Sequence, residues 1–244
     1  MQLAFFITAR MGSIRLPRKH FKDVAGRPAL SHLIERVEAA AQPQDLIVIT
    51  TGSELENREF QSFQSPPRIT VFFGDPENIP RRHLQAAQAL GVSAIVAVDG
   101  DDPLLSINAM MTVAKQLRAG AGLVKTTGLP LGMNAWGYSV NLLSQALESA
   151  AIADKLDTGW GKIFERFTAV TSDFDYANAQ SLRMTLDYAE DLEFFRRVFA
   201  DCPTRILNSD SDLLEWIVDH DIQQINQHLN ALYWEHFNRS EQDS

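Results

Sequence analysis

A loop rich in basic side chains follows the first apolar segment of this 244-residue chain. The apolar run Leu3–Ile7 is typical of a buried strand, and glycine, serine and proline interrupt the charges that come after it. Four cations stand in this loop: Arg10, Arg15, Arg18 and Lys19. Ligands of open α/β sheets bind beyond the carboxyl ends of the strands. Backbone N–H groups and fixed cations suit a polyphosphate, so the loop predicts a nucleoside-triphosphate site rather than a merely solvated basic turn.

A second chemically suggestive segment is the acidic turn Asp99-Gly100-Asp101-Asp102-Pro103, which directly follows the apolar run Ala94–Val98. Carboxylates are the hard oxygen ligands that Mg²⁺ accepts, and this ion usually takes only one or two of them from a protein. Acidic residues with glycine and proline also form ordinary turns. Because the basic loop is expected at the same sheet edge, the combination favours a metal–phosphate site.

A third candidate is Asp187, which ends the run Met184–Asp187 just before a predicted helix. Glu190 and Asp191 stand in the first turn of that helix. Acidic residues at this place stabilise a helix N-terminus, so position alone leaves two roles open for Asp187: helix stabilisation or metal binding.

Other catalytic signatures are missing from the sequence. It has no Walker A motif and no G-x-G-x-x-G pattern, which disfavours a P-loop enzyme and a dinucleotide oxidoreductase. The six histidines show no metal-binding spacing, and nothing marks the single cysteine, Cys202, as a nucleophile.

The elements that would position these residues alternate along the chain. Apolar runs typical of buried strands cover 3–8, 46–50, 69–73 and 94–98, and segments with helical spacing lie between or after them at 29–41, 78–90 and 107–119. A late strand is expected over 181–186. This alternation predicts an α/β fold with a mostly parallel sheet flanked by helices on both faces. We expect one domain over 1–244, with a substrate-side elaboration near 121–180.

Composition narrows the class of protein further. The net charge is −9, which argues against nucleic-acid binding, yet residues 1–30 carry +5. A basic island in an acidic chain points to a small anionic ligand. No apolar run reaches the roughly 20 residues of a membrane span, and a single cysteine fits a reducing cytoplasm. We therefore expect a cytoplasmic protein without membrane insertion.

Together, in this order, these motifs resemble the bacterial sugar cytidylyltransferases of the 3-deoxy-manno-octulosonate, N-acylneuraminate and spore-coat polysaccharide types. The segment Ala9-Arg-Met-Gly-Ser-Ile-Arg-Leu-Pro-Arg-Lys19 is similar to the opening A-R-M-G-S-x-R-L-P-x-K of the spore-coat subgroup. Phe73–Asn78 with Arg81-Arg82, Gly100–Leu104 and Thr185–Leu192 resemble its G-D-x-x-N-V-L-x-R-Y, G-D-C-P-L and T-L-D-x-P-E-D-L segments. The resemblance covers nearly the whole chain.

The resemblance implies a Rossmann-like nucleotidyltransferase fold of the GT-A type and a Mg²⁺-dependent reaction. In that reaction CMP is transferred from CTP to a sugar, sugar acid or related small acceptor, pyrophosphate is released, and the product serves surface glycan synthesis. Arg10 and Lys19 would be catalytic, and Asp101 and Asp187 would bind the metal. The residues expected to bind the nucleotide are Thr8, Ala9, Arg10, Met11, Gly12, Ser13, Lys19, Asp99 and Gly100. A homodimer is also expected by resemblance.

The chain departs from the subgroup on the side expected to bind the acceptor. Gly132-Met-Asn-Ala-Trp136 stands where G-x-D-V-E is usual, so two carboxylates are replaced, and Arg18 replaces the glycine of L-P-G-K. We expect acceptor contacts from Lys125, Asn134, Trp136 and Trp160, although such residues near strand ends also commonly pack and cap. Two alternatives remain: a nucleotide-sugar-dependent glycosyltransferase using Asp99-Gly100-Asp101 as a D-x-D motif, and a non-catalytic nucleotide-binding partner.

Overall fold

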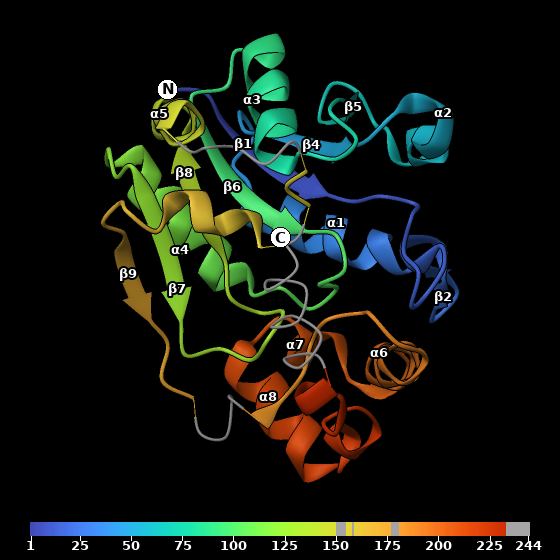
Figure 1. The fold of residues 1–244 in the computed structure, drawn as a ribbon. Helices are drawn as coiled ribbons and strands as arrows, with labels where there is room; N and C mark the ends of the chain where they lie inside the picture. Colours follow the sequence, from blue (N-terminus) through green and yellow to red (C-terminus); the bar gives the residue numbers. More distant parts are fainter. Residues whose placement is uncertain (150–154, 158, 177–180, 233–244) are drawn as a thin grey trace.

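A single large sheet forms the centre of the protein in a computed structural model, which describes residues 1–149, 155–157, 159–176 and 181–232. Its strands are β1 (Leu3–Thr8), β4 (Leu46–Thr51), β5 (Ile69–Phe73), β6 (Ala94–Asp99), β7 (Leu123–Thr127), β8 (Trp136–Ser139) and β9 (Val170–Asp173). Their order is β5-β4-β1-β6-β8-β7-β9 (Figure 1). Among these seven strands β8 alone runs antiparallel to its neighbours. The prediction of a mostly parallel sheet is therefore confirmed.

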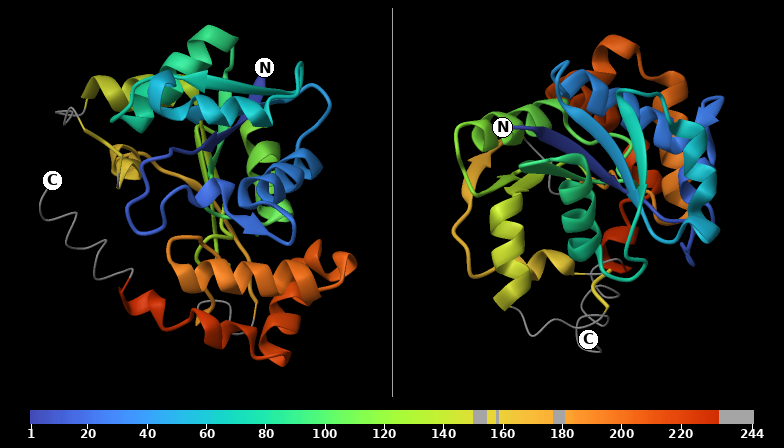
Figure 2. Two further views of the ribbon diagram at one scale, coloured as in Figure 1. Left: turned by 90° about the vertical axis from the view of Figure 1, so that its right-hand side faces the viewer. Right: turned by 90° about the horizontal axis from the view of Figure 1, so that it is seen from above.

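Helices cover both faces of this sheet (Figure 2). One face carries α1 (Ala29–Ala40) and α4 (Ile107–Arg118), and the other carries α3 (Ile79–Leu90), α5 (Val140–Ser149) and the 3-10 turn η3 (Trp160–Phe164). The C-terminal group, at the bottom of Figure 1, consists of α6 (Ala189–Asp201), α7 (Thr204–Leu207), α8 (Asp210–Asp219) and η5 (Ile222–Ile225). The remaining short elements are η1 (Lys19–Phe21), β2 (Asp23–Val24), β3 (Arg27–Pro28), α2 (Glu54–Asn57) and η2 (Arg58–Phe63).

Strand β1 shows why the sequence folds into a covered sheet. Phe5 and Ile7 pack into the core on the α1 side, whereas Ala4 and Phe6 pack into the core on the α3 side. A strand that is buried on both faces reads as a continuous apolar run. Strand β1 therefore packs into both cores, and the basic loop begins where this strand ends, after Thr8 at the edge of the sheet.

The strand expected over 181–186 is not formed. Within the described residues the segment makes one isolated bridge, between Leu131 and Arg183. The Met184 N–H donates to the Leu131 carbonyl at 2.7 Å, and the Leu186 N–H donates to the Asp101 carbonyl at 2.7 Å. Because these donors reach two different loops, no regular ladder develops, and the segment instead ties Asp187 to the acidic turn.

Residues 121–180 contribute β7, β8, α5, η3 and β9 to the described structure. The assignment of 1–244 to one domain, with this region as an elaboration, stays a prediction. No helix in the described ranges is long and apolar enough to cross a membrane.

Candidate active site

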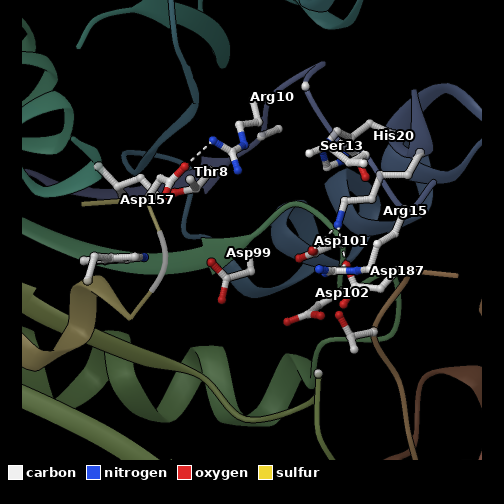
Figure 3. A pocket seen from close by; sticks show the side chains of 18 of the residues that line it. Thr8, Arg10, Ser13, Arg15, His20, Asp99, Asp101, Asp102, Asp157 and Asp187 are labelled. Carbon is white, nitrogen blue, oxygen red and sulfur yellow. Dashed lines mark hydrogen bonds and ion pairs between the residues drawn. The ribbon is translucent and has the colours of Figure 1, made fainter. Parts of the chain in front are cut away.

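A cleft of about 610 Å³ opens where β1 and β6 end, at the edge at which parallel sheets bind ligands. The last residues of these strands, Thr8 and Asp99, are paired in register and both line the cleft. Figure 3 shows basic side chains of the first loop facing acidic ones of β6 and the 187 region. The predicted site residues that line it are Thr8, Ala9, Arg10, Gly12, Ser13, Lys19, Asp99, Asp101 and Asp187.

Two predicted nucleotide-binding residues lie at the margin of this cleft. The Met11 N–H donates to Asn57 Oδ1 at 3.0 Å, and Met11 lines an adjacent cavity of about 620 Å³. The Gly100 N–H donates to the Thr8 carbonyl at 2.9 Å. A Cβ at Gly100 would lie 2.8 Å from that carbonyl, so the close approach of the two strand ends requires glycine.

Lys19 lies between two carboxylates. Its Nζ forms an ion pair with Asp101 and donates to Asp187 Oδ1 at 2.9 Å, and only 10% of its side chain is exposed. Burial alone would lower the pKa of Lys19, but the charges of Asp101 and Asp187 outweigh it and raise that pKa. Lys19 is therefore a permanent cation at the centre of the cleft.

Asp187 receives three cations. Besides Lys19, Arg15 Nη2 lies 2.8 Å from Oδ1 and Arg183 Nη2 lies 3.4 Å from Oδ2. Burial would raise the pKa of Asp187, yet Lys19 and Arg15 lower it to about 2. Asp187 is thus fully ionised at neutral pH, which a metal ligand requires.

A buried network behind Asp187 fixes its direction. Arg183 Nε donates to Asp191 Oδ1 at 2.8 Å, and neither side chain is exposed. Asp191 Oδ2 accepts from the Asp187 N–H at 2.9 Å and from the Tyr188 N–H at 3.0 Å. Asn226 Nδ2, from the C-terminal group, donates to Asp191 Oδ1 at 3.0 Å. The C-terminal elements therefore support a cleft that is built mainly by the N-terminal half.

Asp99 and Asp102 add negative charge to the same cleft. Asp99 opens to the solvent of the cleft, but the surrounding protein and the neighbouring Asp101 raise its pKa to about 7. Burial, with Asp101 and Asp99 nearby, also raises the pKa of Asp102. The loss of hydration raises both pKa values first, and the neighbouring carboxylates raise them further. A cluster of carboxyl groups of this kind favours the binding of a cation.

Arg10 closes one side of the cleft through an ion pair with Asp157, at 2.7 Å. Arg82 of α3 also lines the cleft and is 1% exposed. Its Nε donates to the Asp75 carbonyl at 2.9 Å, whereas its Nη1 has no hydrogen-bond partner in the described structure. Burial and the charge of Arg10 lower the pKa of Arg82 to about 10. The Arg82 guanidinium therefore remains cationic at neutral pH, and the two guanidinium groups suit an anionic ligand.

A magnesium ion fits this set of side chains. No group of three or more metal-binding side chains is preformed in the described residues. Mg²⁺ needs fewer, because it keeps waters and takes phosphate oxygens. Asp101 and Asp187 already share one cation, the Lys19 ammonium, which shows that the place between them favours positive charge.

Of the four predicted acceptor residues, Trp160 lines the cleft. Lys125, Asn134 and Trp136 are not among the lining residues. Asn134 holds a turn, since its Nδ2 donates to the Leu129 carbonyl at 2.8 Å. The centroid of the Trp136 ring lies 4.6 Å from that of Trp160, so Trp136 packs against a lining residue. Lys125 pairs with Trp136 across β7 and β8. Acceptor contact by Lys125, Asn134 and Trp136 stays a prediction.

Several lining residues were not among the predicted site residues. Arg15 was counted among the cations of the basic loop without a role of its own, and Arg82 belongs to a quoted motif, in which a count of cations would have found it. Asp157 and Tyr188 also line the cleft. Asp157 lies 147 positions from its partner Arg10, and no local pattern signals such a contact.

The comparison with protein-family models decides the family. The model described as cytidylyltransferase matches residues 4–206, which include the basic loop, the acidic turn and Asp187. The chain belongs to the cytidylyltransferase family. It is accordingly an enzyme of the nucleotidyltransferase class, which disfavours both the glycosyltransferase and the non-catalytic alternatives.

Individual relatives agree with this family. The chain is 24% identical over 221 residues to the spore coat polysaccharide biosynthesis protein SpsF of Bacillus subtilis, covering 87% of this chain and 92% of the relative. A cytidylyltransferase structure from Leptospira borgpetersenii is similar with a TM-score of 0.79 and 21% identity, over 92% of this chain and 97% of that one. A CMP:2-keto-3-deoxy-manno-octonic acid synthetase in complex with CTP gives a TM-score of 0.63 and 13% identity, over 82% and 99%. The fold of this cytidylyltransferase is therefore the Rossmann-like nucleotidyltransferase fold.

Proposed function

We propose that this cytidylyltransferase transfers CMP from CTP to a hydroxyl group of a sugar, sugar acid or related small acceptor, for surface glycan synthesis in the cytoplasm. The observation that carries the proposal is the Lys19 ammonium held between Asp101 and Asp187 in the cleft. The comparison with SpsF, a spore coat polysaccharide biosynthesis protein, supports the glycan role.

In the proposed reaction an acceptor oxygen attacks the α-phosphorus of CTP. The new O–P bond forms, the bond from the α-phosphorus to the bridging oxygen breaks, the hydroxyl proton passes to water, and pyrophosphate leaves. Lys19 and Arg10 face the cleft and would neutralise the triphosphate and the leaving pyrophosphate. Such preorganised charge is the main protein contribution to phosphoryl-type transfer.

Asp101 and Asp187 would hold Mg²⁺, and this ion would stabilise charge on the phosphates. Arg183 and Asp191 keep the Asp187 carboxylate aimed at Lys19 before any ligand arrives. The rest of the cleft wall, including Trp160, would limit the access of water to the α-phosphorus.

The test is a panel of nucleoside triphosphates with Mg²⁺, read as the shift in melting temperature. CTP should stabilise the protein more than ATP, GTP or UTP, because a ligand that binds only the folded state raises its stability. Lys19→Ala should lose most of the shift. Lys115→Ala, which removes an exposed lysine of α4, serves as the control and should keep it. If no triphosphate stabilises the wild-type protein, the proposed function is wrong.

A further inference from the structure

A buried polar chain runs from Tyr138 through His83 to the cleft residue Thr8. The Tyr138 hydroxyl lies 2.6 Å from His83 Nδ1, and His83 Nε2 lies 2.9 Å from Thr8 Oγ1 and 3.2 Å from Thr50 Oγ1. Tyr138 and His83 are 0% exposed, whereas Thr8 lines the cleft, where Figure 3 shows it beside Arg10. The function proposed above leaves this chain of groups unexplained.

His83 is neutral in these surroundings. Its ring packs edge-on against Phe6 and Trp160, with centroids 5.3 Å away in both pairs. Burial, together with the charge of Arg82, lowers its pKa to about 3. One ring nitrogen therefore carries a proton at neutral pH and the other accepts a hydrogen bond.

The hydrogen-bond partners decide which nitrogen is protonated. In the described structure the Tyr138 hydroxyl has His83 as its hydrogen-bond partner. Its proton is satisfied only if Nδ1 accepts it, since an unpaired buried donor is costly. The Thr50 hydroxyl can donate to the Ile7 carbonyl, at 3.5 Å, which leaves its oxygen free to accept from Nε2. Both observations favour a proton on Nε2.

We propose that His83 is a positioning residue: its single Nε2–H, which lies closer to Thr8 Oγ1 (2.9 Å) than to Thr50 Oγ1 (3.2 Å), donates mainly to Thr8 Oγ1 and thereby turns the Thr8 hydroxyl proton toward the bound nucleotide. The Thr8 side chain then offers a donor to an acceptor oxygen of the nucleotide. This inference rests on the proposed function for the identity of the ligand, CTP. The direction of this relay, in which Tyr138 donates to His83 and His83 donates to Thr8, rests on the geometry of the free protein.

Nitrogen NMR of the free protein tests the direction of the relay without any ligand. The histidine signals that are absent in His83→Phe belong to His83. We expect Nδ1 to resonate as an unprotonated, acceptor nitrogen and Nε2 as a protonated one. Tyr138→Phe should move the Nδ1 resonance, whereas Tyr176→Phe, a matched change at a tyrosine outside the cleft lining, should leave it in place. A protonated Nδ1 in the wild-type protein overturns the proposal.

Binding of CTP, measured by calorimetry, tests the consequence for the nucleotide. Thr8→Val should weaken binding about 5- to 10-fold, as for one lost hydrogen bond. Thr8→Ser keeps the hydroxyl and should restore most of the affinity. His83→Phe should weaken binding less, and the double variant Thr8→Val/His83→Phe should bind like Thr8→Val alone, because both changes remove one interaction.

The outcomes separate this inference from the proposed function. A wild-type protein that binds no CTP contradicts the proposed function. If the wild-type protein and Thr8→Val bind CTP with equal affinity, the role proposed for His83 and Thr8 is wrong, while the proposed function stands. Additive losses in the double variant also contradict that role, since they would show that His83 acts on the nucleotide site independently of Thr8.

Discussion

At the scale of single residues, the cleft depends on charges that are buried and paired. Lys19 forms ion pairs with Asp101 and Asp187 in the cleft. Arg183 forms buried ion pairs with Asp187 and Asp191. Removing one member of a buried pair leaves an uncompensated charge, which costs far more than the loss of an exposed pair. The supporting residues should therefore be as sensitive to substitution as those that face the ligand.

We expect Asp191→Asn to lower the free energy of unfolding by about 3–5 kcal/mol, because Arg183 would keep its buried charge without its partner. The measurement is a urea titration followed by circular dichroism. The matched control is Asp201→Asn, which breaks the exposed pair that Asp201 makes with Arg197 at 2.6 Å. That change should cost at most about 1 kcal/mol. Equal losses in the two variants would show that the buried network carries no special stability.

At the scale of elements, the segment before α6 matters more than its lack of regular structure suggests. It lies against the turn at Gly132, where a Cβ would approach the Met184 carbonyl oxygen to 2.4 Å. Gly132 also has a φ of 88°, in the left-handed region. The turn and the segment that carries Asp187 therefore share one tight contact.

Gly132→Ala should destabilise the protein and weaken CTP-dependent stabilisation, because the turn must move away from Met184 and disturb Asp187. The control, Gly120→Ala, has a similar φ of 98° but open space around the added Cβ. Thermal melts with and without CTP and Mg²⁺ measure both effects. The contact argument fails if the two substitutions lower the melting temperature equally.

These elements also show how far the sequence could predict the fold. The strands β1, β4, β5 and β6 were predictable because burial on both faces leaves continuous apolar runs. The run Ser181–Leu186 alternates polar and apolar residues, which also predicts a strand, yet the N–H groups of Met184 and Leu186 donate to two different loops. The presence of Lys19, Asp101 and Asp187 at one sheet edge could be predicted because each stands in a contiguous motif, and all three line the cleft. The contact of Asp157 with Arg10 and that of Asn226 with Asp191 could not, since they join segments that are far apart in the sequence.

At the scale of the whole molecule, two histidines are enclosed in a neutral form beside the cleft. Burial lowers the pKa of His83 to about 3, with Arg82 adding to the effect, and burial with the charge of Lys19 lowers that of His20 to about 4. Their ordinary value is about 6.5. Below that pH the unfolded chain binds protons that the folded chain refuses, so acid favours unfolding.

His20 and His83 should therefore lower the free energy of unfolding as the pH drops below about 6.5, each by up to about 1.4 kcal/mol per pH unit until its folded pKa is reached. Asp99 and Asp102, whose pKa values are raised in the folded protein, act in the opposite direction. His83→Phe should remove the His83 contribution, so that its pH dependence diverges from that of the wild type below pH 6.5, whereas His228→Phe, at an exposed histidine, should not. Urea titrations at a series of pH values measure the slopes, and an unchanged slope in His83→Phe would contradict the burial of a neutral ring.

A homodimer, also a property of the whole molecule, stays a prediction that sedimentation can test.

The proposed activity itself is tested most directly by the release of pyrophosphate from CTP in the presence of Mg²⁺ and a panel of sugars and sugar acids. We expect at least one acceptor to give release that depends on CTP and on the metal, and we expect Lys19→Met to lower kcat by about 10²–10³. Lys115→Met should keep the wild-type rate. Release from another triphosphate in preference to CTP, or a Lys19→Met variant as active as the wild type, would contradict the account.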